Sequence, residues 1–203
     1  MIPKEFLNLM AARQGHFRLE SGHHGNLWLD LDPLFLRPGR LRPFVVELAN
    51  ALSRRNIEAV CGPLVGGAFL AQMIASRLEA EFFYTERVAL PEREALYSVK
   101  YRLPNSLRDR VHGKQVAIVD DVINAGSAVR GTFEELQACG AKPVVVGALL
   151  VLGASAPGFF ADQHIPLERL ASLPNDLWVP PECPLCASQM PLEDLAPGQI
   201  SQT

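Results

Sequence analysis

The 203-residue sequence lacks the features that would direct it to a membrane or to nucleic acid. No apolar run is long enough to cross a bilayer, which takes about 20 residues. Residues 1–5 do not show the pattern of a signal peptide. The net charge is −3, so no basic field favours nucleic acid or an anionic lipid surface. We therefore expect a cytoplasmic protein with no membrane or nucleic-acid partner.

Cysteine is scarce, with four residues in the whole chain. Cys61 and Cys139 lie in apolar contexts and are expected to be buried thiols. Cys183 and Cys186 form a CxxC pair that resembles half of a zinc knuckle, and a structural zinc site needs four ligands. With no histidine nearby in sequence, His164 or the CxxC of a second copy would have to complete such a site. A disulfide or two free thiols are the alternatives.

The composition that remains is typical of one ordinary globular domain. Hydrophobic residues make up 48% of the chain and charged residues 20%, and the length allows a sizeable core. Eight of the 16 prolines fall between Pro157 and the C-terminus. We expect that tail to be poor in strands and to lie over the core as an extension.

Hydrophobic periodicity predicts alternating strands and helices. We expect helices over residues 2–10, 40–54, 66–78 and 127–138, strands near 15–20, 27–30, 59–61, 82–84, 116–119 and 144–152, and a long polar loop over 88–112. Continuous apolar strands between helices predict an α/β fold with a central parallel sheet flanked by helices. Ligands of such sheets bind beyond the carboxyl ends of the strands.

The strongest chemical signal is the stretch 116–127. An apolar strand runs into Asp120 and Asp121, and a small-residue turn and a helix start follow. The backbone N–H groups of such a turn form an anion cradle. Two acids beside an anion need a hydroxyl-rich sugar or a divalent cation between them, because carboxylates bind ribose hydroxyls and Mg²⁺. The stretch therefore predicts a site for ribose, phosphate and metal.

This stretch resembles the motif with which type I phosphoribosyltransferases bind 5-phosphoribosyl-1-pyrophosphate (PRPP). The resemblance implies that Asp120 and Asp121 hold the ribose, act in catalysis and bind Mg²⁺ together with PRPP. The implied phosphate loop consists of Asn124, Ala125, Gly126, Ser127 and Ala128, with Asn124 where threonine is usual. The family fold implies a single domain over residues 1–203. Within it we expect small N-terminal hood elements over 1–39, a PRPP-binding core over 40–155 and a Pro-rich extension over 156–203.

Two further stretches resemble orotate phosphoribosyltransferases in particular. Residues 15–22 with 28–30 resemble their hood strands, and residues 61–68 resemble their pyrophosphate loop. Paired glycines that open a helix allow close backbone approach to a diphosphate. The implied PRPP-binding residues here are Gly62, Pro63, Leu64, Val65, Gly66, Gly67 and Arg87. Trp28 and Arg130 are implied in base binding, Arg130 as a bidentate partner of the base carboxylate. For the glycine pair the alternative is a tight turn that binds no ligand. For Arg130 it is a solvated charge on the helix surface.

Three features depart from the orotate pattern. Glu86 and Arg87 stand where arginine and lysine are usual, and Glu20 and His23 lie near places where lysine often meets orotate. The loop 88–112 lacks a Lys-x-His-Gly sequence. Its implied catalytic cations are Lys100 and Arg102, which would neutralise the leaving diphosphate, although a solvated loop that binds nothing is the alternative.

Together these features predict an enzyme that transfers the phosphoribosyl group of PRPP to a base. Orotate is the expected base, with orotidine 5′-monophosphate and pyrophosphate as products and Mg²⁺ as cofactor. The resemblance also implies a homodimer, because in the family the catalytic loop reaches the neighbouring site. Transfer to another base is one alternative. The other is a non-catalytic, PRPP-binding regulatory protein, which would act through protein partners because the sequence shows no basic helix-turn-helix.

Overall fold

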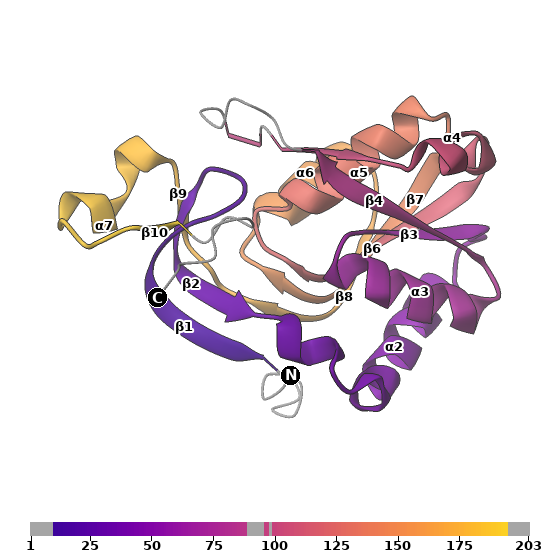
Figure 1. The fold of residues 1–203 in the computed structure, drawn as a ribbon, viewed down its shortest axis with the longest axis horizontal. Helices are drawn as coiled ribbons and strands as arrows, with labels where there is room; N and C mark the ends of the chain where they lie inside the picture. Colours follow the sequence, from indigo (N-terminus) through magenta and orange to yellow (C-terminus); the bar gives the residue numbers. More distant parts are fainter. Residues whose placement is uncertain (1–9, 89–95, 98, 195–203) are drawn as a thin grey trace.

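The computed structural model describes residues 10–88, 96, 97 and 99–194 (Figure 1). The helix expected over residues 2–10 lies outside this part of the chain, except for its last residue. The described residues form a six-stranded sheet in the order β5-β4-β3-β6-β7-β8 and a four-stranded sheet in the order β10-β1-β2-β9. No helix of the described residues is long and apolar enough to span a membrane.

The six-stranded sheet confirms the predicted α/β fold. Its parallel strands are β3 (Ala59–Pro63), β4 (Glu81–Val88), β6 (Gln115–Ile123), β7 (Lys142–Leu152) and β8 (Leu167–Leu173). The helices are α2 (Pro38–Leu52), α3 (Gly66–Leu78), α4 (Asn105–Val111), α5 (Ser127–Ala138), α6 (Ser155–Asp162) and, in the extension, the short α7 (Pro184–Ala187). Successive residues of the central strands enter different cores: Val60 packs with α2 and α3, whereas Cys61 packs with α5 and α6. Both faces are thus covered, which explains the continuous apolar strands.

The loop expected over residues 88–112 contains regular structure in its described part. β5 (Lys100–Arg102) pairs antiparallel with β4, and α4 follows it. Tyr101, Leu103 and Val111 are buried although their neighbours are polar. The prediction of a loop over the whole stretch was wrong because single apolar anchors, spaced through charged residues, do not produce a periodic signal.

The C-terminal extension contains more strand than expected. β8 lies parallel to β7 and was not among the predicted strands. β8 is an edge strand with only Ala171 buried, and its sequence therefore lacks the apolar run of a central strand. Two further short strands, β9 (Leu177–Trp178) and β10 (Glu193–Asp194), join the other sheet.

The four-stranded sheet, which we call the hood, stands beside the carboxyl ends of the main strands (Figure 1). β1 (Ala11–Arg18) and β2 (His24–Asp30) form the predicted antiparallel pair. The extension pairs with both outer edges, β9 with β2 and β10 with β1. A 3-10 turn, η1 (Asp32–Phe35), connects the hood to α2.

Candidate functional site

A cavity of about 450 Å³ lies where the hood faces the carboxyl ends of β3 and β6. Most of its lining comes from three segments: hood residues 19–21 and 27–31, residues 63–67 at the end of β3, and residues 120–128 at the end of β6. Phe35, Phe69 and Leu152 complete it. Its volume falls within the range of small-molecule sites. The main-sheet segments are the two that sequence analysis singled out, and the topology brings them together because β3 and β6 are adjacent parallel strands.

Asp120 and Asp121 line the cavity from the last part of β6. Both are buried, at 8% and 5% exposure. Asp120 Oδ1 accepts a hydrogen bond from the Asp121 backbone N–H (3.1 Å), and Asp121 Oδ1 accepts one from Val122 N–H (2.8 Å). Burial, and next the charge of Asp121, raise the pKa of Asp120 well above its usual value. Two buried carboxylates side by side favour hydroxyl donors or a divalent cation between them.

The loop after β3 lies directly against these acids, and only glycine permits this. A Cβ atom on Gly66 would lie 2.2 Å from Asp121 Oδ2, and one on Gly67 would lie 2.6 Å from Asp120 Oδ1. Leu64 and Val65 stand at the rim, 40% and 63% exposed, and the peptide bond between them is cis. The backbone of this loop is therefore open to a ligand in the cavity.

The segment after β6 ends in the N-terminus of α5. Gly126 adopts a left-handed conformation (φ +88°), and the helix begins at Ser127. No side chain in the described part of the chain caps this N-terminus, so its free N–H groups and the helix dipole favour an anion. Asn124 Oδ1 accepts a hydrogen bond from Asn175 Nδ2 (2.9 Å), which lies in the extension. Sequence reasoning missed Asn175 because nothing in its local context points to the site.

The hood contributes both an apolar wall and an acid. Trp28 and Glu20 line the cavity. Glu20 accepts a hydrogen bond from the Tyr101 hydroxyl (3.0 Å) and lies 2.8 Å from Arg87 Nε. Arg87, expected at the diphosphate, thus faces a hood carboxylate and is absent from the described lining. Glu86 is exposed on the opposite face of β4, as strand alternation requires.

Arg130 lies one turn into α5 and outside the described cavity lining. Its guanidinium stands over the rings of Tyr97 and Phe159, 4.1 and 4.4 Å from their centroids. Nη2 donates to the Ser155 carbonyl oxygen (3.0 Å) and lies 3.1 Å from Ser155 Oγ. Burial lowers the pKa of Arg130. The arginine is therefore oriented by aromatic rings and is not a freely solvated helix-surface charge.

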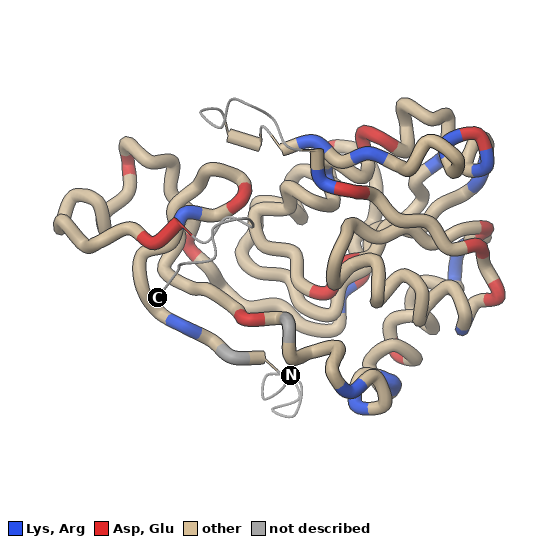
Figure 2. The backbone as a smooth tube through the Cα atoms, in the orientation of Figure 1, with Lys and Arg blue, Asp and Glu red and all other residues tan. Residues whose placement is uncertain are grey.

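The expected catalytic cations do not line the cavity in the described part of the chain. Lys100 is exposed on β5. Arg102 Nη1 and Arg108 Nη1 both donate to Glu135, a carboxylate that is 1% exposed in α5. Figure 2 shows lysine and arginine along β5 and α4, away from the hood. Arg102 is thus held in a structural ion pair.

The CxxC pair meets two histidines of the hood. Cys183 and Cys186 are free thiols beside His16 and His24. His164, suggested above as a further ligand, is exposed, contacts the Ala161 carbonyl oxygen through Nδ1 and does not belong to this group. The sequence does not indicate the actual grouping because the three cysteine–histidine pairs in contact are 167, 170 and 162 residues apart.

Known proteins resemble this chain along most of its length. The model of the phosphoribosyl transferase domain matches residues 44–164. Orotate phosphoribosyltransferase of Thermotoga maritima is 31% identical over 192 residues, which cover 94% of this chain and 95% of that protein. The enzyme of the same name from Helicobacter pylori strain G27 is 28% identical, covering 93% and 94%.

Solved structures share the fold. Adenine phosphoribosyltransferase from Thermoanaerobacter pseudethanolicus superposes with a TM-score of 0.65 at 18% identity, covering 84% of this chain and 99% of that one. Orotate phosphoribosyltransferase from Aeropyrum pernix superposes with a TM-score of 0.63 at 23% identity, covering 85% and 94%.

Proposed function

The chain belongs to the phosphoribosyltransferase family, and from that premise we propose that it transfers the phosphoribosyl group of PRPP to orotate. The products are orotidine 5′-monophosphate and pyrophosphate. The observation that carries the proposal is the cavity in which the Asp120–Asp121 pair, the glycine loop and the free N-terminus of α5 meet beneath the hood. The similarity to enzymes named orotate phosphoribosyltransferase extends through the hood and favours orotate as the base.

Each part of PRPP has a matching surface in this cavity. Asp120 and Asp121 accept hydrogen bonds from the ribose hydroxyls. The 5-phosphate binds the backbone N–H groups of residues 124–128 at the start of α5. The diphosphate binds the backbone of residues 62–67, where Gly66 and Gly67 allow close approach. Substitution at the anomeric carbon then depends on positioning and on stabilisation of the charge that develops.

The residues present fit the magnesium ion that the reaction implies. Mg²⁺ prefers oxygen ligands and is commonly bound by one or two carboxylates together with substrate phosphates. Asp120 and Asp121 offer such oxygens at the ribose end of the cavity. When bound, the ion neutralises charge on the leaving diphosphate.

The base is proposed to bind against the hood. Trp28 offers an aromatic surface to a planar ring, and Arg130 offers a guanidinium to the carboxylate of orotate. The contacts of Arg130 with Ser155 support this role, because they orient the guanidinium. Arg130 belongs to α5, the helix that begins at the phosphate loop. Arg87 is proposed to reach the diphosphate on release from Glu20.

We also propose that the enzyme acts as a homodimer in which Lys100 serves the neighbouring site. Lys100 is exposed at the start of β5. Arg102 is a weaker candidate for the same task, since it would have to leave the buried carboxylate of Glu135.

A turnover assay with purified protein tests the function. We expect loss of orotate absorbance that needs both PRPP and Mg²⁺, with omission of each as the control. A panel of other bases runs in parallel. If the protein turns over a different base and not orotate, that base replaces orotate as the assigned substrate. If it binds PRPP but turns over no base, a regulatory protein is favoured.

A further inference from the structure

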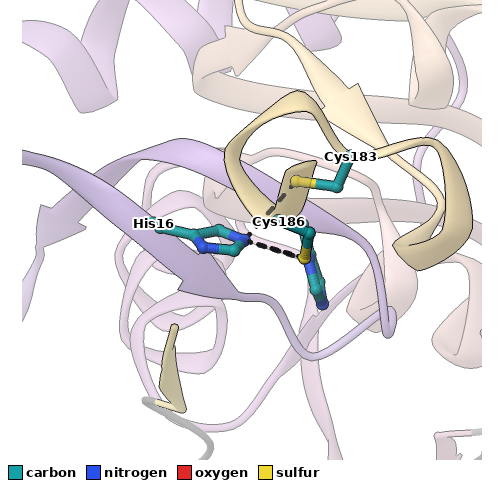
Figure 3. Close-up of side chains that lie close together, drawn as sticks. His16, Cys183 and Cys186 are labelled. Carbon is teal, nitrogen blue, oxygen red and sulfur yellow. Dashed lines mark hydrogen bonds between the residues drawn. The ribbon is translucent and has the colours of Figure 1, made fainter. Parts of the chain in front are cut away.

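We propose that two histidines of the hood and two cysteines of the extension bind one structural zinc ion. The four ligands are His16, His24, Cys183 and Cys186. None of them lines the cavity described above, so the site is separate from the proposed transferase chemistry. Figure 3 shows the imidazole of His16 pointing toward the sulfur atoms of the CxxC turn.

The distances between the candidate ligand atoms lie close to those of a tetrahedral zinc site. Zinc binds histidine nitrogen at about 2.0–2.1 Å and cysteine sulfur at about 2.3 Å, which places tetrahedral ligands about 3.3–3.8 Å apart. His16 Nε2 lies 3.0 Å from His24 Nδ1 and 3.4 Å from Cys183 Sγ. Cys186 Sγ lies 3.3 Å from His24 Nδ1 and 3.7 Å from His16 Nε2. All four atoms lie within 4.8 Å of one another, close enough to share one ion after small adjustments.

A neighbouring carbonyl prepares His16 for this role. His16 Nδ1 lies 2.9 Å from the Met190 carbonyl oxygen. A carbonyl oxygen can only accept, so Nδ1 carries the hydrogen and Nε2 presents its lone pair toward the other three ligands. Such an outer hydrogen bond is the usual partner of a zinc-bound histidine, because it fixes both tautomer and ring orientation. Met190 belongs to the same turn region as the cysteines, so the extension provides both ligands and orientation.

The ligand set selects zinc and a structural role. Two thiolates and two imidazoles in a tetrahedron suit Zn²⁺, whereas Mg²⁺ prefers oxygen ligands. All four positions are filled by the protein, which leaves none for a substrate. His16, His24 and Cys183 are buried, and Cys186 is exposed. The exposed sulfur provides the route by which the ion enters.

The ion would fasten the extension to the hood. The cysteine turn lies between β9 and β10, which pair with the opposite edges of the β2–β1 hairpin through only two registered residue pairs each. Two-residue strands contribute little on their own. His24 follows the β1–β2 turn, and Leu19, Glu20 and Ser21 of that turn line the cavity. Zinc would therefore hold one wall of the cavity in place.

Metal content of the full-length protein tests the site. The protein is purified without a metal-affinity tag and dialysed, and its metal content is measured by elemental mass spectrometry. We expect about one zinc ion per chain, and loss of that zinc in the double variant Cys183→Ser/Cys186→Ser. Cys139→Ser is the matched control, because it removes a partly buried thiol elsewhere and should keep the zinc.

A cobalt measurement on the unaltered chain covers the case in which the double variant does not fold. After zinc is removed under reducing conditions, Co²⁺ should give the strong visible bands of a tetrahedral site and a thiolate-to-cobalt charge-transfer band. Both thiols should resist a thiol reagent until a chelator is added. The proposal is overturned if the native protein holds no stoichiometric zinc and Co²⁺ gives only weak octahedral bands. A Cys183–Cys186 disulfide in the freshly purified, unreduced protein would overturn it as well.

Discussion

At the scale of single residues, Gly66 joins the two motifs that the sequence shows separately. A methyl group there would meet Asp121 Oδ2 at 2.2 Å, so Gly66→Ala must displace either the Asp121 carboxylate or the loop after β3. We expect kcat/KM for PRPP to fall at least about tenfold, since about 1.4 kcal/mol of lost transition-state binding has that effect. Gly158→Ala in α6 is the control, because a Cβ at Gly158 meets nothing within 4 Å. Steady-state kinetics that rank the two variants equally would contradict the assignment.

A substitution at Asp121 tests the same site by removing a charge without changing the volume of the side chain. Asp121→Asn keeps the shape of the side chain but weakens its hydrogen bonds to ribose hydroxyls and its affinity for a cation. Hydrogen bonds to a charged group contribute about 1.5–3 kcal/mol, so we expect kcat/KM to fall about 10- to 100-fold or more. The thermal unfolding midpoint should stay near that of the parent chain. Asp109→Asn on the exposed surface of α4 is the control, and wild-type turnover of Asp121→Asn would refute the ribose assignment.

Replacing Arg130 tests whether this residue binds the base or serves as a general anion site. Arg130→Ala removes the guanidinium held by Ser155 and the two aromatic rings. If the group pairs with the carboxylate of orotate, KM for orotate should rise about tenfold or more while KM for PRPP changes little. Separate titration of each substrate measures the two effects. Equal losses for both substrates would place Arg130 at the phosphates or in the scaffold.

At the scale of elements, Glu135 connects β5, α4 and α5. Its buried carboxylate accepts hydrogen bonds from Arg102, Arg108 and the Leu103 backbone N–H. Arg102→Ala should therefore lower the free energy of unfolding by about 1 kcal/mol, a modest value because the arginine is half exposed. Lys100→Ala should leave that free energy unchanged and lower kcat. Chemical denaturation together with kinetics separates the two, and the reverse pattern would assign the catalytic role to Arg102.

The sequence predicted those elements whose apolar pattern is strong and continuous. β6 and β7 are buried on both faces, and α5 begins and ends where its periodicity predicts. β5 and β8 were not predicted, because each lies at an edge of the sheet and buries a single residue. Their pairing is determined by neighbouring strands that are distant in sequence, and a local pattern does not carry that information.

The same limit applies to the candidate sites. Asp120, Asp121 and the glycines were found because the stretch around each has a recognisable order of strand, turn and helix. The glycine loop and the acids meet as predicted, since adjacent parallel strands present their carboxyl ends together. The bonds between Glu20 and Tyr101 and the grouping of His16 with Cys183 depend on how the hood stands against the rest of the chain. That placement is a tertiary property.

At the scale of the whole molecule, the proposed homodimer, in which Lys100 serves the neighbouring site, predicts complementation between subunits. In a dimer of one Asp121→Asn chain and one Lys100→Ala chain, one site has both defects and the other has none. Random reassembly of equal amounts, with heterodimers forming half of the population, should restore about a quarter of wild-type activity from two nearly inactive parents. The measurement is turnover after mild dissociation and mixing, with each variant mixed with itself as the control. If Lys100 acts within its own subunit, every site of the mixture keeps one defect and the activity stays at the level of the parents.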